Sequence, residues 1–283
     1  MTEMVGAHGI VGNRFFPPTA TTDDPFAADE LALPTLSIFA NPGGDNGPSS
    51  REIDTGFEFD KLLFPKFSLG VSDQFISVKT PGQGTSSGFG DVVMIAKYIM
   101  WENVKHEWIL SVGGQVQIGG TGNPRFANSF TTFTPMVYFG KGLGDLPDSV
   151  DFLKPFALTG QVGLSLPTST ANPNTLPWGL ALEYSLPYLQ QHVKDVGLPA
   201  PFKNMIPLVE FSMNTGLNRG ADGHTTGTIN PGVLWEAPDF QLGVEALIPI
   251  NGQTGPHVGA VLQLQLFIDD LFPKIFGHPI FGI

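Results

Sequence analysis

Cysteine is absent from this chain of 283 residues, and charged side chains are scarce. The absence of cysteine rules out disulfides and is compatible with an exported protein. Charged residues make up 14% of the sequence, whereas soluble domains typically contain about 25%. Only 14 residues are basic against 26 acidic ones, which gives a net charge of -12. Because phosphate backbones repel such an acidic chain, we expect no nucleic-acid partner.

Long apolar runs are absent as well. No stretch approaches the roughly 18 apolar residues of a membrane-spanning helix. Since every backbone N–H and C=O group must be paired inside a bilayer, a closed barrel is the only other way for a chain to cross one. The 35 glycines and 25 prolines predict frequent turns and argue against long helices.

Residues 156–186 show a period of two. Leu158 and Val162 fall on one side of the first half, and Thr159 and Gln161 fall on the other. Successive side chains of a strand point to opposite faces, so this pattern predicts a hairpin with one apolar face and one small, mostly uncharged polar face. Strands of about ten residues, tilted by about 45°, cover the ~25 Å apolar band of a membrane barrel. Strands of soluble proteins have about five or six residues.

The same alternation recurs between residues 31 and 268 and predicts about twelve strands. An even number places both termini on one side of the membrane. We therefore predict an all-β fold, a transmembrane antiparallel up-and-down β-barrel of about 12 strands in the bacterial outer membrane. Residues 187–204 form the longest connection and depart from the rule that periplasmic turns are short. A soluble β-sandwich that binds a ligand is the alternative, because its half-buried strands also alternate.

Two irregular segments flank the predicted barrel. Residues 1–30 are rich in proline and lack a period, and we call them the leader. We favour a leader that lies as a tail against the periplasmic rim over one that forms a plug in the lumen. Residues 269–283 are predicted to be a C-terminal tail. The first nine residues lack the basic and apolar regions of a signal peptide, and because export requires one, we expect that it has been removed.

Aromatic residues flank two of the short predicted turns. Tryptophan and other amphipathic rings prefer the boundary between lipid and water. The alternative is that these rings pack the rim of a soluble protein. The predicted interface girdle consists of Trp101, Trp108, Trp178, Trp235 and Phe240.

Several short motifs accompany the alternation. They are RFFP at residues 14–17, TDDPF at 22–26, ELALPT at 30–35 and GFGD at 88–91. With these motifs the chain resembles a family of bacterial outer-membrane β-barrel transporters of the phenol meta-pathway degradation type. The resemblance implies an outer-membrane channel for aromatic or other poorly soluble compounds, and it implies no catalytic residues.

The polar side of the predicted strands would face the lumen. Long amides can line water or bond a passing solute, and carboxylates raise the local concentration of cations. We therefore predict a porin-like channel for the passive uptake of small solutes. A barrel whose lumen is closed, with a structural or binding role, is the alternative, because twelve strands lie between filled eight-stranded barrels and open porins. The candidate lumen residues are Glu58, Lys97, Gln115, Gln117, Thr159, Gln161, Glu183, Asn230, Gln241, Glu245, Gln263 and Gln265.

The residue types needed for catalysis are scattered. The six histidines form no pair at metal-ligand spacing, so we predict no metal site. His224 and His257 are the only plausible bases for a barrel lipase with a serine nucleophile. We therefore expect no enzyme activity and no cofactor. The expected partners are the lipid bilayer and a small-molecule solute, and the sequence contains no signal for an oligomeric state.

Overall fold

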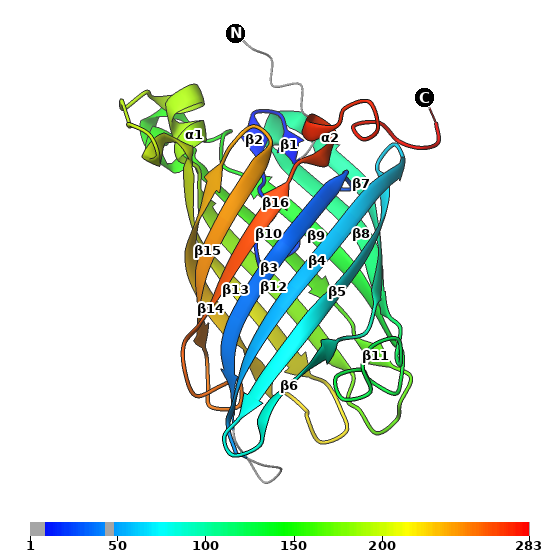
Figure 1. The fold of residues 1–283 in the computed structure, drawn as a ribbon. Helices are drawn as coiled ribbons and strands as arrows, with labels where there is room; N and C mark the ends of the chain where they lie inside the picture. The colour runs from blue at the N-terminus through cyan, green and yellow to red at the C-terminus, as the bar shows by residue number, and fades with distance from the viewer. Residues whose placement is uncertain (1–8, 43–47, 283) are drawn as a thin grey trace.

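The computed structural model describes residues 9–42 and 48–282 of the chain. Twelve long antiparallel strands of this part follow one another around a closed barrel, which confirms the predicted fold class (Figure 1). The twelve strands are β3 (Glu30–Asn41), β4 (Ser50–Phe64), β5 (Phe67–Thr80), β7 (Val93–Asn103), β8 (Trp108–Gln117), β9 (Thr132–Gly142), β10 (Phe156–Gly163), β12 (Thr175–Tyr184), β13 (Met205–Gly216), β14 (Thr225–Glu236), β15 (Phe240–Pro249) and β16 (Gly259–Leu266). The pairing of β16 with β3 completes the barrel.

Short strands accompany the barrel. β6 (Gly84–Phe89) pairs with β5, and β11 (Leu166–Pro167) pairs with β9. In the leader, β1 (Ile10–Val11) and β2 (Arg14–Phe15) form a separate two-stranded sheet. Residues 1–8, which belong to the stretch without signal-peptide features, lie outside the described residues, as do residues 43–47 between β3 and β4.

The alternation in the sequence corresponds to the two faces of the wall. On β15 the side chains of Leu242 and Val244 are 46% and 45% exposed, whereas those of Gln241 and Glu245 are buried. The apolar side chains therefore point outward, where a bilayer would cover them, and the polar ones point inward. The hydrophobic effect thus fixes the facing of each strand, because a shift by one residue would reverse it.

Both flanking segments join the barrel at one end, at the top of Figure 1, which is the periplasmic end in barrels of this kind. The turns at residues 65–66, 104–107 with η1 (Val104–His106) and 237–239 are short there. Two longer connections lie at the same end. The one between β9 and β10 contains η2 (Asp148–Leu153). The one between β12 and β13 contains α1 (Leu186–Tyr188), η3 (Leu189–Val193) and η4 (Phe202–Asn204). No helix in the described residues is long and apolar enough to cross a membrane.

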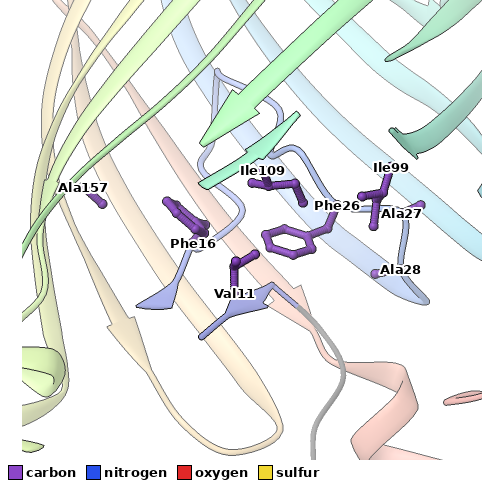
Figure 2. Close-up of a cluster of buried hydrophobic side chains, with 8 residues drawn as sticks. All are labelled: Val11, Phe16, Phe26, Ala27, Ala28, Ile99, Ile109 and Ala157. Atoms are coloured by element: carbon purple, nitrogen blue, oxygen red, sulfur yellow. The ribbon is translucent and has the colours of Figure 1, made fainter. Parts of the chain in front are cut away.

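The described part of the leader lies inside the barrel, so the favoured placement against the rim is corrected. Figure 2 shows Phe16 and Phe26 of the leader in a buried cluster with Ile99 of β7, Ile109 of β8 and Ala157 of β10. These wall positions face inward near the periplasmic end, where they provide an apolar surface. The rings of the leader are buried against that surface, and their burial stabilises the inside placement.

The C-terminal boundary also differs slightly from the prediction. The last strand ends at Leu266, two residues before the predicted end of the barrel. A short helix, α2 (Ile268–Leu271), follows and buries Ile268. Residues 272–282 then return along the periplasmic end toward β4.

Candidate functional site: the lumen and the leader inside it

Lys97 joins the barrel wall to the leader. Its ammonium, which is buried on the lumenal face of β7, donates to Oδ1 of Asp23 at 2.8 Å and to the backbone oxygen of Asp24 at 2.9 Å. The same Nζ lies 4.9 Å from the centre of the Tyr138 ring. A buried ammonium is costly unless it is paired and hydrogen-bonded. The leader therefore supplies the partners that make Lys97 tolerable in the lumen.

Glu210 of β13 binds the leader on the opposite wall. One carboxylate oxygen accepts from the backbone N–H of Thr22 at 2.8 Å and from the hydroxyl of Thr19. The other accepts from the N–H of Thr21 at 3.1 Å and from its hydroxyl at 2.9 Å. Glu210 is completely buried. Four hydrogen bonds to one carboxylate compensate the loss of its hydration.

The two neighbouring strands bind the same turn of the leader. Asn230 of β14 donates to the hydroxyl of Thr21 at 2.8 Å, and Gln241 of β15 donates to the backbone oxygen of Pro18 at 2.7 Å. Glu245 of β15 accepts from the N–H group of residue 20 at 3.4 Å. Three adjacent strands thus provide a row of polar side chains that matches the backbone of residues 18–22.

Arg14 attaches the leader at the periplasmic end. Its guanidinium donates to Oε2 of Glu107 at 3.2 Å, to the backbone oxygen of Pro155 at 3.0 Å and to that of Lys154. It also lies 3.7 Å from the centre of the Tyr188 ring. Burial and a hydrogen bond to Glu107 raise the pKa of Tyr188 to about 12, so this hydroxyl stays protonated and donates to Oε1 at 2.8 Å. The guanidinium of Arg14 therefore donates hydrogen bonds through its N–H groups and contacts the Tyr188 ring through its planar face.

Asp29 fixes the point where the leader becomes the first barrel strand. Its carboxylate accepts from Nζ of Lys61 at 2.8 and 2.9 Å and from the N–H of Leu62 at 2.7 Å. It also accepts from the N–H of Gly277 at 2.9 Å. Together with the contacts of residue 14 and of residues 18–24, these hydrogen bonds of Asp29 attach the leader to the barrel at both of its described ends and in its middle. The leader therefore narrows the lumen.

A cavity of about 510 Å³ occupies the lumen beside the leader. It extends along β3–β5 from Glu30 and Asp60 to Asp91 and Phe126 near the opposite end of the barrel, and residues 18–24 form part of its wall. The described lining includes no lysine, arginine or histidine. Its carboxylates belong to Asp23, Asp24, Glu30, Glu58, Asp60, Asp73 and Asp91. A lining of one sign in a low-dielectric wall attracts cations.

Three oxygen atoms of this lining have no hydrogen-bond partner within the described chain. They are Oε1 of Gln161, Oε1 of Gln263 and Oδ1 of Asp91, and all are shielded from bulk solvent. All three are acceptors. Buried polar groups are usually satisfied, so these three acceptors are exceptions in the described part of the chain.

The predicted lumen residues divide into two sets. One set lines the cavity and consists of Glu58, Gln115, Gln117, Gln161, Gln263 and Gln265. The other set is buried and bonds the leader or another wall residue, as Thr159 does with Glu183 at 3.1 Å. That set consists of Lys97, Thr159, Glu183, Asn230, Gln241 and Glu245.

Several acidic groups of the lumen are not among the predicted residues. Glu210 and Asp60 follow the same alternation as the chosen candidates and could have been selected by it. Asp23 and Asp24 lie in the leader, which has no period, so no sequence signal placed them in the lumen.

The predicted girdle residues lie at both ends of the wall. At the periplasmic end the rings of Trp101 and Trp108 are 5.1 Å apart, and those of Trp235 and Phe240 are 5.8 Å apart. Trp178 lies on β12 toward the opposite end and donates from Nε1 to a threonine hydroxyl at 3.3 Å.

The two candidate lipase bases lie on or beside loops at the end opposite the leader. In the described part of the chain, neither the imidazole of His224 nor that of His257 is hydrogen-bonded to a serine.

The comparisons with known proteins bear on the fold. No protein-family model and no curated protein matches the sequence. An outer-membrane channel from Pseudomonas putida F1 matches with a TM-score of 0.56 and 15% identity, over 89% of this chain and 99% of that one. The NanC porin also matches, with a TM-score of 0.46 and 9% identity, over 82% of this chain and 97% of that one. The KdgM porin matches with a TM-score of 0.45 and 10% identity, over 83% of this chain and 98% of that one. The likeness to the Pseudomonas channel shows that this chain has the fold of an outer-membrane β-barrel.

Proposed function

We propose that the chain is an outer-membrane channel for the passive passage of small solutes, and that it favours solutes with a positive charge. The observation that carries this proposal is the cavity beside the leader, whose described lining contains seven carboxylates and no basic side chain. Lys97, the nearest ammonium, is already paired with Asp23. The lumen therefore presents an excess of negative charge to an entering solute.

Organic amines are candidates among the possible cations. An ammonium group can donate up to three hydrogen bonds, and the acidic residues of the lining offer acceptors for them. The cavity volume of about 510 Å³ lies in the range of about 300–1,000 Å³ that is usual for small-molecule sites. An amine of moderate size would fit.

A second candidate solute class is aromatic or other poorly soluble compounds, as the resemblance to the phenol-pathway transporters implies. Apolar side chains of Ile76, Val93 and Phe126 contribute to the lining of the same cavity. They would contact an apolar ring, although they provide no charge preference. Proteoliposomes that contain the protein should therefore be tested with an aromatic amine and with phenol at equal concentration. Faster entry of the amine supports the first class, and faster entry of phenol supports the second.

The proposal is tested by the current through the refolded protein in a planar bilayer under a salt gradient. We expect discrete current steps and a reversal potential whose sign indicates cation selectivity. Neutralising two lining carboxylates, with Glu58→Gln and Asp73→Asn, should move the reversal potential toward zero. The matched control Glu102→Gln, at the turn between β7 and β8 and outside the cavity, should leave it unchanged. An inserted protein that passes no current would favour the closed structural or binding barrel instead.

A further inference from the structure

The segment that follows the last strand has no role in the lumen. Residues 272–282, which we call the strap, run along the periplasmic end from α2 to β4 (Figure 1). The backbone N–H groups of Ile280 and Phe281 donate to the carbonyl oxygens of Leu62 and Leu63 at 3.2 and 2.7 Å. The strap therefore crosses the region where the first and last barrel strands pair.

The strap lies on the outer surface of the wall. The ring of Phe276 is 6.2 Å from that of Phe59, which points outward because its neighbour Glu58 lines the lumen. Lys61, two residues along the same face, donates to the backbone oxygen of His278 at 3.0 Å. These contacts place the strap on the side of β4 that faces the membrane.

The strap turns large apolar side chains away from the protein. Phe272 is 53% exposed, Ile275 is 64%, Ile280 is 54% and Phe281 is 54%. The outward-facing Phe64 lies beside Phe281, with their ring centres 5.3 Å apart, and is itself half exposed. A contiguous exposed apolar patch of this kind marks a surface that contacts a membrane or another protein.

We propose that the strap is an interfacial anchor that docks on the periplasmic leaflet of the bilayer, with a phospholipid surface as its partner. The patch is continuous with the lipid-facing wall through Phe59 and Phe64. At the same end of the barrel, Trp235 and Phe240 mark the interface on β14 and β15, and Trp101 marks it on β7. Around the barrel, β16, β3, β4 and β5 lie between those two positions, and the strap adds aromatic and aliphatic side chains within this interval, beside β4.

The charge of the strap agrees with this partner. Lys274 is exposed among the apolar side chains. A lysine at an interface can bury its methylene groups against lipid while its ammonium reaches the headgroups. This inference goes beyond the channel proposal and does not depend on which solute passes.

Because the chain contains no cysteine, single labels can be introduced without background. Ile275→Cys and Phe281→Cys variants are labelled with an environment-sensitive fluorophore and refolded into phosphatidylcholine vesicles that contain brominated lipid. Leu182→Cys on the outward face of β12 provides the lipid-embedded reference. Thr170→Cys, in the exposed loop between β10 and β12, provides the aqueous reference. Heat-dependent migration in a gel confirms that each labelled variant is folded.

We expect the labels at positions 275 and 281 to emit at shorter wavelength than the label at 170 and to lose fluorescence to brominated lipid as strongly as the label at 182. Unquenched emission that matches the label at 170 overturns the proposal. Disulfide cross-linking of unlabelled Ile275→Cys molecules in dilute vesicles also overturns it, because the strap would then contact a second copy of the chain rather than lipid.

Discussion

Nζ of Lys97 on the barrel wall lies 2.8 Å from Oδ1 of Asp23 in the leader. The two residues are 74 positions apart in the sequence, and both side chains are largely withdrawn from water. This ion pair, with the adjacent bond from Lys97 to the backbone of Asp24, couples the position of the leader to the wall of the lumen. The first three predictions below concern contacts of this kind between the leader and the barrel.

The first prediction concerns this ion pair. Lys97→Met leaves the Asp23 carboxylate without its partner, and breaking a buried pair in this way costs about 3–5 kcal/mol. We expect the leader to leave its site more often, so single-channel recordings should show larger and more variable current steps. Lys79→Met, at an exposed position on β5, is the matched control and should behave like the natural protein. Adding Asp23→Asn to Lys97→Met removes the unpartnered charge and should partly restore the leader to its site. Fully additive effects of the two substitutions would contradict the coupling.

A second prediction concerns Glu210. The amides of Thr21 and Thr22 donate to its carboxylate, and hydrogen bonds to charged groups contribute about 1.5–3 kcal/mol each. In Glu210→Ala, hydrogen exchange at these two amides should accelerate by roughly 10- to 100-fold. The amide of Phe16 bonds within the leader itself and should change less. Unaltered exchange at Thr21 and Thr22 would show that Glu210 does not bind the leader in solution.

A third prediction concerns Arg14. Lysine conserves the charge but has neither the planar face that contacts Tyr188 nor enough fixed donors to reach all three acceptors. Arg14→Lys should therefore release the beginning of the leader almost as fully as Arg14→Ala. Labelling of a buried Val11→Cys reporter by a water-soluble maleimide measures this release. The rate should rise in both backgrounds, and a slow rate in Arg14→Lys would mean that charge alone is sufficient.

A fourth prediction tests the two faces of the wall. Val244 points outward from the middle of β15, where an arginine in the bilayer costs about 2–4 kcal/mol. Gln161 lines the cavity, so Gln161→Arg should fold with a smaller loss and should also weaken cation selectivity. The urea midpoints of unfolding in lipid vesicles are compared between Val244→Arg and Gln161→Arg. Equal midpoints would contradict the assigned facing.

The wall was predictable from the sequence because one physical requirement acts at every second residue. Lipid demands apolar side chains outward, so pairs such as Val244 and Glu245 reveal their faces without any knowledge of their neighbours. The predicted lumen residues follow from the same rule. Their division between cavity lining and leader contacts does not, because it depends on where the leader lies.

The position of the leader was not predictable by that rule. Its bonds join residues far apart in the sequence, such as Thr21 and Glu210, and neither a period nor a spacing relates them. Prolines and mixed polarity in residues 9–29 suit a tail as well as a plug. The strap at residues 272–282 presents the same difficulty, because its hydrogen bonds to β4 use its backbone groups, which carry no sequence signal.

The most direct test of the account is the single-channel conductance of the refolded protein with and without residues 1–24. This deletion removes the segment that fills part of the lumen and keeps Asp29 with its bonds to β4. Both proteins are first shown to be folded by heat-dependent gel migration. The account predicts that the shortened protein passes larger current steps and that its reversal potential remains on the cation side. Equal conductance in the two folded proteins would contradict the conclusion that the leader narrows the path through the barrel.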